Sequence, residues 1–425
     1  MKNALNLIVS FLLLVAAVGC DSSSSDDGGS GGTAGVGGTG GAGGEGGSAG
    51  VGGVAGGGGE GGIGGEGGTG GVDLSPKDFL SEWELFDDIR NQVPADGVIP
   101  FEVTSPLFTD YALKHRFVTL RMGGQLEYSD DERWQAPVGT IYVKTFAYPI
   151  DMRSPEMGEQ LVETRLLVHD VDGWKVWVYV YDEEMTDAVL TLGGVSVSVS
   201  WIDQDGNPQT IENYGVPSNG ACRKCHGTSP ATRTLGPSTG MLNRDNDYGE
   251  GLVNQIDHLN TLGLLSNAPP PEDENNPRIT YVDPVEHNAG CSPGDFDCLH
   301  EAARSWLDSN CSHCHAANGE VADKVLFLDW ANLDPASEDT TSWGVCKTAT
   351  SAGNGVTCTQ NYDIFPGDPD RSLLLCRIES VTAGEMMAPL GRSTVHAEGA
   401  QVIRDWIAAM DTNDPRFAPC NLILE

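Results

Sequence analysis

Two short motifs in this chain combine two cysteines and a histidine at the same spacing. Residues 222–226 have the sequence CRKCH and residues 311–315 the sequence CSHCH. Two thiols at this spacing can reach the two vinyl groups on one edge of a porphyrin and form thioethers, and the next side chain then directs its imidazole at the iron. This is the spacing of c-type haem attachment. We therefore predict two covalently bound c-type haems, attached through Cys222, Cys225, Cys311 and Cys314, with His226 and His315 as iron ligands.

Two other uses of paired cysteines agree less well with the chain. Zinc ribbons separate their two cysteine pairs by about 15–20 residues, whereas 85 residues lie between Cys225 and Cys311. A thioredoxin-like redox pair stands at the start of a helix in a βαβ setting. No such alternation surrounds either motif, so haem attachment is the better interpretation.

A loop near the C-terminus is the predicted source of the distal ligand of the second haem. The sequence MMAPLG at residues 386–391 places a Met ahead of a Pro, which resembles the distal loop of a class I cytochrome c. Met387 matches that pattern best, and Met386 is its rival. The alternative is a methionine that only fills a gap in the core.

The first haem has two candidate distal ligands. Met241 lies 15 residues after His226, and His258 lies on a predicted helix at residues 254–262. Both stay open as metal ligands, together with the alternative that neither coordinates the iron. His115 is a more remote candidate, for which a surface or core position is the simpler interpretation.

The elements around the second motif are predicted to be helical. Apolar residues between Leu299 and Leu307 recur at helical spacing, and Asp295 is placed to cap the helix that they form. Apolar residues between Val402 and Met410 recur in the same way and predict a closing helix.

The segment before the first motif has the composition of strands. Residues 140–146 and 174–181 are rich in β-branched and aromatic side chains. Asp-Gly pairs at 172–173 and 205–206 are typical of hairpin turns. Residues 73–97 carry apolar side chains that suit a helical lead-in.

These patterns together predict a multidomain α+β fold. An antiparallel, sandwich-like β domain at residues 73–210 leads into a first haem segment at 211–270. A C-terminal, all-α class I cytochrome c domain follows at 271–425.

The N-terminus has the features of an export signal. Lys2 precedes an apolar run at residues 4–17, which is shorter than the roughly 20 residues of a spanning helix. Small residues then precede Cys20 and resemble a bacterial lipobox. Residues 1–20 are therefore predicted to be a lipoprotein signal peptide, and Cys20 the lipid anchor to a membrane. Ordinary cleavage beside an incidental cysteine is the alternative.

A glycine-rich stretch follows the signal. Residues 21–72 hold half of the 56 glycines and almost nothing to bury, which predicts a disordered tether. The chain is then an exported lipoprotein of the cell envelope, facing the periplasm or attached to the outer membrane of a Gram-negative bacterium.

The cysteines that remain agree with an oxidising compartment. Six are left when Cys20 and the motif cysteines are set aside, and an even remainder in an exported chain predicts three disulfides. Proximity favours Cys291–Cys298, Cys346–Cys358 and Cys376–Cys420. Six cysteines allow 15 pairings, and one pair left free is the alternative.

The charge of the chain narrows the class of partner. The 61 Asp and Glu outnumber the 24 Lys and Arg, for a net charge of −37. This argues against nucleic acid as the main partner, because phosphate binding needs a basic face. An acidic surface suits a redox partner protein with a basic docking face.

A wider resemblance adds to these motifs. Residues from about 80 to 410 resemble a family of exported bacterial dihaem c-type cytochromes with a β-rich N-terminal domain, an unusual first haem segment and an ordinary cytochrome c domain. Both haem motifs match, and Met387 falls at the family's Met-x-Pro-Leu-Gly position, whereas the family does not lead us to expect Met at position 241. The other segments that carry the resemblance are residues 99–114, 137–140, 144–146, 163–167, 242–244 and 254–255.

The resemblance implies electron transfer in the cell envelope and no particular substrate. We therefore predict a membrane-anchored electron carrier rather than an enzyme. The alternative is a dihaem peroxidase or oxidase, which needs an open or displaceable distal site at the first haem. A β domain that docks an envelope partner or a carbohydrate is a third alternative.

Overall fold

The computed structural model describes residues 72–130, 133–227, 232–249, 251–270, 277–349, 357–417 and 420. The predicted signal peptide, the lipid anchor at Cys20 and all but the last residue of the predicted tether lie outside these residues. The described residues belong to one compact unit.

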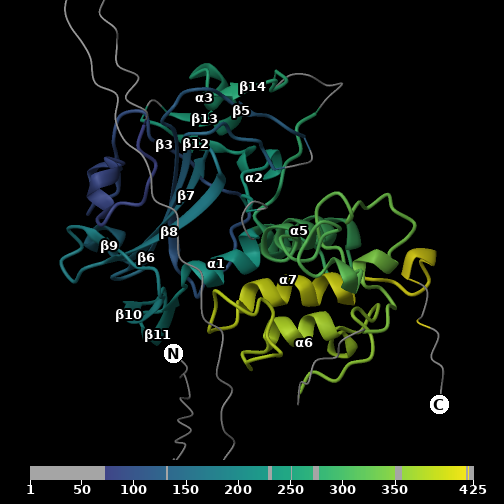
Figure 1. Ribbon diagram of the computed structural model, residues 1–425. Helices are drawn as coiled ribbons and strands as arrows, with labels where there is room; N and C mark the ends of the chain where they lie inside the picture. Colours follow the sequence, from purple (N-terminus) through teal and green to yellow (C-terminus); the bar gives the residue numbers. More distant parts are fainter. Residues whose placement is uncertain are drawn as a thin grey trace, which may run out of the picture. The chain divides into compact units, whose positions relative to one another are not determined.

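The centre of this unit is a six-stranded antiparallel sheet with the strand order β3-β4-β6-β7-β8-β9 (Figure 1). The strands predicted at residues 140–146 and 174–181 are confirmed as β6 and β8, and the Asp172-Gly173 pair lies at the turn between β7 and β8. The strands are β3 (Ile99–Pro100), β4 (Leu113–Leu120), β6 (Thr140–Pro149), β7 (Glu159–Asp170), β8 (Gly173–Tyr181) and β9 (Ala188–Leu190).

A separate hairpin of β10 (Val195–Ile202) and β11 (Pro208–Val216) packs against this sheet. Its turn contains the predicted Asp205-Gly206 pair. Trp201 and Tyr214 of the hairpin lie beside Tyr148 of β6 in a common core. Strand β11 leads almost directly into α1 (Asn219–His226), which carries the first motif.

Short elements complete the strand-rich part of the unit. Residues 73–97 do not form the predicted helix. A 3-10 turn, η1 (Leu80–Trp83), ends at Glu84, whose left-handed backbone (φ 49°) stops the helix, and its apolar residues pack into the core of the sheet. The remaining strands are β1 (Phe86–Asp88), β2 (Val93–Pro94), β5 (Leu126–Glu127), β12 (Asp245–Asp247), β13 (Leu252–Asn254) and β14 (Leu265–Ser266).

The helices predicted from apolar spacing are confirmed. The predicted helix at 254–262 is α3, and the helix before the second motif is α5, capped by the side chain of Asp295, which accepts a hydrogen bond from the Cys298 amide. The closing helix is α7, which packs between α5 and α6 (Figure 1). The helices after α1 are α2 (Thr239–Leu242), α3 (Gln255–Thr261), α4 (Pro284–Gly290), α5 (Phe296–Asn310), α6 (Leu373–Glu379) and α7 (Ala397–Ala408). In the described part of the chain, none of them is long and apolar enough to cross a membrane.

The predicted fold class is wrong, most clearly in its C-terminal, all-α class I cytochrome c domain. Between Cys311 and Leu373 the described residues form loops and 3-10 turns rather than α-helices. This irregular stretch supplies Trp343, Val345 and Ile364 to the core around α5, α6 and α7. Apolar side chains there enter the core without a regular period, so the fold is mixed rather than all-α in this region.

The sandwich is wrong as well. Among the described residues, one six-stranded sheet and four two-stranded sheets replace a pair of matched sheets. The sheet side and the helical side join into one unit through buried polar contacts. The Ser105 hydroxyl donates to the Ser305 carbonyl (2.8 Å), and Arg133 pairs with the buried carboxylate of Asp308 (3.1 Å).

Three disulfides are present among the described residues, and one has the predicted pairing, Cys291–Cys298. The predicted pairs Cys346–Cys358 and Cys376–Cys420 are wrong, because the structure joins Cys346 to Cys420 and Cys358 to Cys376. The chain folds back on itself here, so sequence proximity misleads. The hydroxyl of Thr340 donates to the carbonyl of Arg416 (2.7 Å), which brings the C-terminal segment beside residue 346.

Candidate haem-binding site

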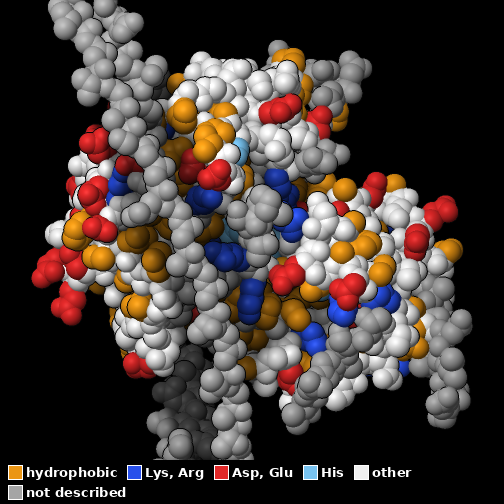
Figure 2. All heavy atoms as spheres, viewed as in Figure 1, with side chains coloured by type: hydrophobic (Ala, Val, Ile, Leu, Met, Phe, Trp, Pro, Cys, Tyr) orange, Lys and Arg blue, Asp and Glu red, His pale blue; other side chains and the backbone are white. Residues whose placement is uncertain are grey.

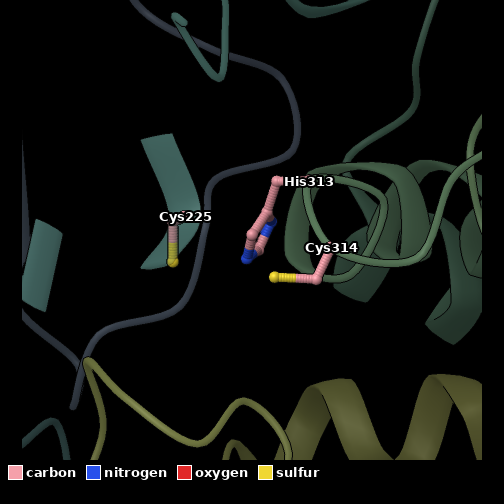
Figure 3. Close-up of side chains that lie close together, drawn as sticks. All are labelled: Cys225, His313 and Cys314. Carbon is pink, nitrogen blue, oxygen red and sulfur yellow. The ribbon is translucent and has the colours of Figure 1, made fainter. Parts of the chain in front are cut away.

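The two C-x-x-C-H motifs meet in space. The first lies on α1, whose N-cap Ser218 accepts a hydrogen bond from the Ala221 amide, and the second lies in the turns that follow α5. Cys225 of the first motif faces His313 and Cys314 of the second (Figure 3), and the three ligand atoms lie within 4.8 Å of one another. Tertiary folding therefore joins motifs that 85 residues separate in the sequence.

Both motifs open into one cavity between the sheet and the helices. Its volume is about 640 Å³, which is within the range of small-molecule and cofactor sites. Aromatic and aliphatic side chains from β6, β8, α5 and α6 form much of its wall. The predicted haem and iron ligands on its lining are Cys222, Cys225, His226, Cys311, Cys314, His315, Met387 and Met241.

The four motif cysteines are free thiols, whereas the other six cysteines from Cys291 onwards are joined in disulfides. The thiols of Cys225 and Cys314 are in contact, and this contact shifts their pKa values in opposite directions. Contact with the Cys314 thiol, and then with His313, lowers the pKa of Cys225 to about 4, and the same contact raises the pKa of Cys314. The motif thiols thus remain available for thioether formation.

The two motif histidines are neutral and differ in how they are oriented. Burial lowers the pKa of both His226 and His315 to about 4, and an imidazole must be neutral to bind iron. Nδ1 of His226 donates to the carbonyl of Arg233 (2.9 Å), which leaves Nε2 with a lone pair, as in other metal-binding histidines. Nδ1 of His315 is buried and makes no hydrogen bond with a described residue. The Leu326 backbone raises the pKa of His315, but by less than burial lowers it.

The predicted distal ligands separate into two groups. Met387 and Met241 line the cavity, whereas Met386 is not among its lining residues. The carbonyl of Met387 accepts hydrogen bonds from Arg392 Nη2 (2.7 Å) and Nε (3.1 Å), which holds the loop in place.

The histidine candidates lie away from the cavity. His258 stacks on Tyr248, with ring centroids 3.6 Å apart. Nε2 of His115 lies at hydrogen-bonding distance, 2.6 Å, from a carboxylate oxygen of Glu159. Neither side chain belongs to the described lining of the cavity, so the structure brings Met241, and not these histidines, to the wall that holds the first motif.

Sequence reasoning missed a residue, Asp110, that holds the chain beside the loop at residues 386–391. Asp110 is buried, and its carboxylate accepts hydrogen bonds from both the amide and the hydroxyl of Ser393 and of Thr394 (2.7–2.9 Å). These residues directly follow the loop that carries Met387. A lone Asp in a strand-rich segment gives no sequence signal for such a contact, which joins residues 283 positions apart.

Sequence reasoning also missed the charge of the cavity. Eight of the chain's 24 Lys and Arg line it, against two of its 61 Asp and Glu among the described residues. Figure 2 shows Lys and Arg gathered along the middle of one face, with Asp and Glu spread over the periphery. An acidic protein has therefore concentrated positive charge at one internal surface.

Two clusters of metal-binding side chains offer an alternative to haem, and neither fits well. His287, Cys291 and Cys298 lie together, but the two cysteines form a disulfide and have no thiolate to donate. Cys225, His313 and Cys314 supply three donors within the described residues, whereas structural zinc takes four. The free thiols, the neutral imidazoles and the cationic cavity fit a c-type haem better.

Comparisons with family models, with curated proteins and with solved structures found no match to this chain.

Proposed function

We propose that this protein is a dihaem c-type cytochrome that transfers electrons, with both attachment motifs opening into one cavity. The observation that carries the proposal is the meeting of the two motifs, in which Cys225 and Cys314 lie within 4.8 Å of each other. A bound c-type haem supplies one-electron redox chemistry at its iron. The chain would then be a member of the exported dihaem family that its motifs resemble.

Each part of the site has a defined task in this proposal. The free thiols of the two motifs would form the thioethers, and the neutral rings of His226 and His315 would bind iron. The carbonyl of Arg233 fixes the orientation of His226. Met387 would supply a thioether ligand to the second iron, and Arg392 together with Asp110 holds the loop that carries it.

The contact between the motifs supports transfer between the two cofactors. Arg233 strengthens this contact, because its guanidinium donates to the carbonyls of His313 (2.7 Å) and Asn318 (3.1 Å) while its own carbonyl holds His226. The attachment points therefore sit on one hydrogen-bonded framework. Such a framework favours a fixed separation between donor and acceptor within the chain.

Charge supports a protein as the external redox partner. The net charge of −37 favours a partner with a basic docking face, and salt should slow the encounter. The proposal places the protein in the cell envelope, anchored by lipid on Cys20. Cys20→Ser should move the protein from the membrane fraction to the soluble fraction, and a variant that stays with the membranes would remove this part of the proposal.

The haem content of the purified full chain tests the proposal. Two haems per chain should survive denaturation and gel electrophoresis, and the double variant Cys222→Ala, Cys225→Ala should keep half of the iron. The matched control is Cys291→Ala, Cys298→Ala, which removes two cysteines outside the cavity and should keep both haems. One haem or none in the unmutated protein would overturn the proposal.

A further inference from the structure

Three cations stand side by side on the face of the sheet that lines the cavity. Arg116 of β4 is paired in register with Lys144 of β6, and Lys144 is paired with Arg165 of β7. All three line the cavity. Like charges directly opposite each other destabilise a sheet, so this arrangement needs a compensating interaction.

The two arginines of this cation row have partners. Arg165 makes a bidentate contact with Glu163 (2.6 and 2.9 Å), a fully buried carboxylate that also accepts a hydrogen bond from Tyr214 (2.9 Å). Arg116 lies 3.3 Å from a carboxylate oxygen of Glu102. Both arginines therefore have a carboxylate partner.

Lys144, at the centre of the row, has no such partner. It makes no hydrogen bond or ion pair with a described residue, and its ammonium lies 5.1 Å from the centre of the Phe146 ring. Burial, and then the charges of Arg116, Lys114 and Arg165, lowers the pKa of Lys144 well below its usual value. Lys144 is half-buried and lines the cavity, so an anion in the cavity would offset the repulsion between the three neighbouring cations and favour the charged form of Lys144.

The cation row belongs to the first motif rather than the second. Cys222 of this motif packs in the same core cluster as Phe146. The centre of the Phe146 ring lies 5.1 Å from the ammonium of Lys144 and 4.3 Å from the guanidinium of Arg165. Helix α1, which carries this motif, packs against β8 of the same sheet. A ligand attached to the first motif therefore lies within reach of the row.

We propose that the row of Arg116, Lys144 and Arg165 is a carboxylate-binding subsite that pairs with the propionate groups of the first haem. The proposal rests on the proposed function and deepens it, because it assigns residues to the anionic edge of the cofactor. Propionates are the carboxylates that a haem brings into the cavity. A diffusible anion such as acetate has the same chemistry and is the competing source.

The experiment uses the full-length protein with both haems, in which the propionate carboxyl carbons carry ¹³C. Reduced-minus-oxidised infrared difference spectra are recorded for the unmutated protein, Lys144→Met, Lys144→Arg and Lys175→Met. Lys175 lies on β8 of the same sheet and is not part of the cavity lining, so it is the matched control.

Lys144→Met should shift the labelled propionate bands and lower the reduction potential of one haem, because a cation near the iron favours the reduced state. Lys144→Arg should restore both properties, and Lys175→Met should change neither. Two haems in Lys144→Met with unshifted labelled bands would overturn the subsite and leave the dihaem function standing. Absence of haem from the unmutated protein would overturn both the subsite and the dihaem function.

Two further outcomes count against the subsite. If acetate, added to the unmutated protein at constant ionic strength, changes the potential while the labelled bands stay in place, the row holds a diffusible anion. If Lys144→Met allows carbon monoxide to bind at a haem that did not bind it before, Lys144 is an iron ligand. The acetate titration needs no variant, so the proposal stays testable if Lys144→Met fails to fold.

Discussion

The two C-x-x-C-H motifs share a pentapeptide pattern but lie in different surroundings. The first lies on the short helix α1, which follows the β10–β11 hairpin in the chain, and it faces a sheet that carries a row of cations. The second follows the long helix α5 and lies beside a helical core, and the irregular chain after it is tied by two disulfides. The same chemistry is thus supported by hydrogen bonds and charge in one case and by packing and covalent links in the other.

The difference extends to the histidines. The carbonyl of Arg233 orients the ring of His226 through Nδ1, whereas Nδ1 of His315 has no hydrogen-bond partner among the described residues. A ring held by a carbonyl is a stronger iron ligand than one that is not. The two motifs therefore share a sequence pattern but differ in the hydrogen bonding of their histidines.

The largest expected difference between the two sites concerns their distal ligands. Met387→Ala should open one coordination site, so that carbon monoxide binds half of the haem in the reduced protein. The potential of the second haem should fall, because Met/His ligation raises the potential. Ligand binding is followed by the visible spectrum, and potentials by titration.

Met386→Ala is the matched control and should be spectrally silent, because Met386 does not line the cavity. If Met386→Ala opens the site and Met387→Ala does not, Met386 and not Met387 is the distal ligand of the second haem.

For the first haem, Met241→Ala should open a coordination site if Met241 is the distal ligand, and His258→Ala is the control. Reaction of the unmutated protein with peroxide would favour the enzyme alternative at the first haem.

Loss of a disulfide should have the next largest effect, on the free energy of unfolding. All three disulfides lie in the region around the second motif, residues 291–420. Removing the Cys346–Cys420 link with two serines should lower the free energy of unfolding by about 4 kcal/mol, because the link closes a long loop in the unfolded chain. Removing Cys291–Cys298 should cost about 2 kcal/mol, since its sequence separation is 7 rather than 74. Urea unfolding monitored by circular dichroism gives both values. Equal losses would show that loop length does not govern stability here.

The smallest expected effect is acid sensitivity in the second region. His300 is buried, its Nε2 donates to the Leu333 carbonyl, and its Nδ1 accepts from the Trp406 indole. Burial lowers its pKa to about 4, so the unfolded state binds more protons between about pH 6.5 and pH 4. The free energy of unfolding should therefore fall as the pH falls through this window, by at most about 1.4 kcal/mol per pH unit for this histidine.

His300→Gln should reduce that dependence, because glutamine can donate and accept but does not titrate. The measurement is urea unfolding at several pH values between 7 and 5. A slope that stays the same in the variant would assign the acid sensitivity to another group, for example His396, whose pKa burial also lowers to about 4.

Several features of this protein were determined by the sequence alone, because their signals are local. The two C-x-x-C-H motifs, strands β6 and β8, and helices α5 and α7 each depend on residue types and spacing within one segment. The even number of remaining cysteines likewise predicts three disulfides without any knowledge of the fold.

Only the tertiary structure decided which of these segments meet. The contact between Cys225 and Cys314, the pairing of Cys346 with Cys420 and the clamp of Asp110 on the distal loop all join residues far apart in the chain. The mixed fold of the C-terminal region has the same origin, because its irregular stretch packs without a period that a sequence pattern can reveal.

The row of cations on the sheet shows why the sequence alone does not reveal which side chains become neighbours. Arg116, Lys144 and Arg165 become neighbours only through the register of three strands, and a shift of one residue would send a side chain to the opposite face. Register is set by the combined packing of a whole sheet against its core. A sequence shows which residues carry charge, but the fold decides which charges share a cavity.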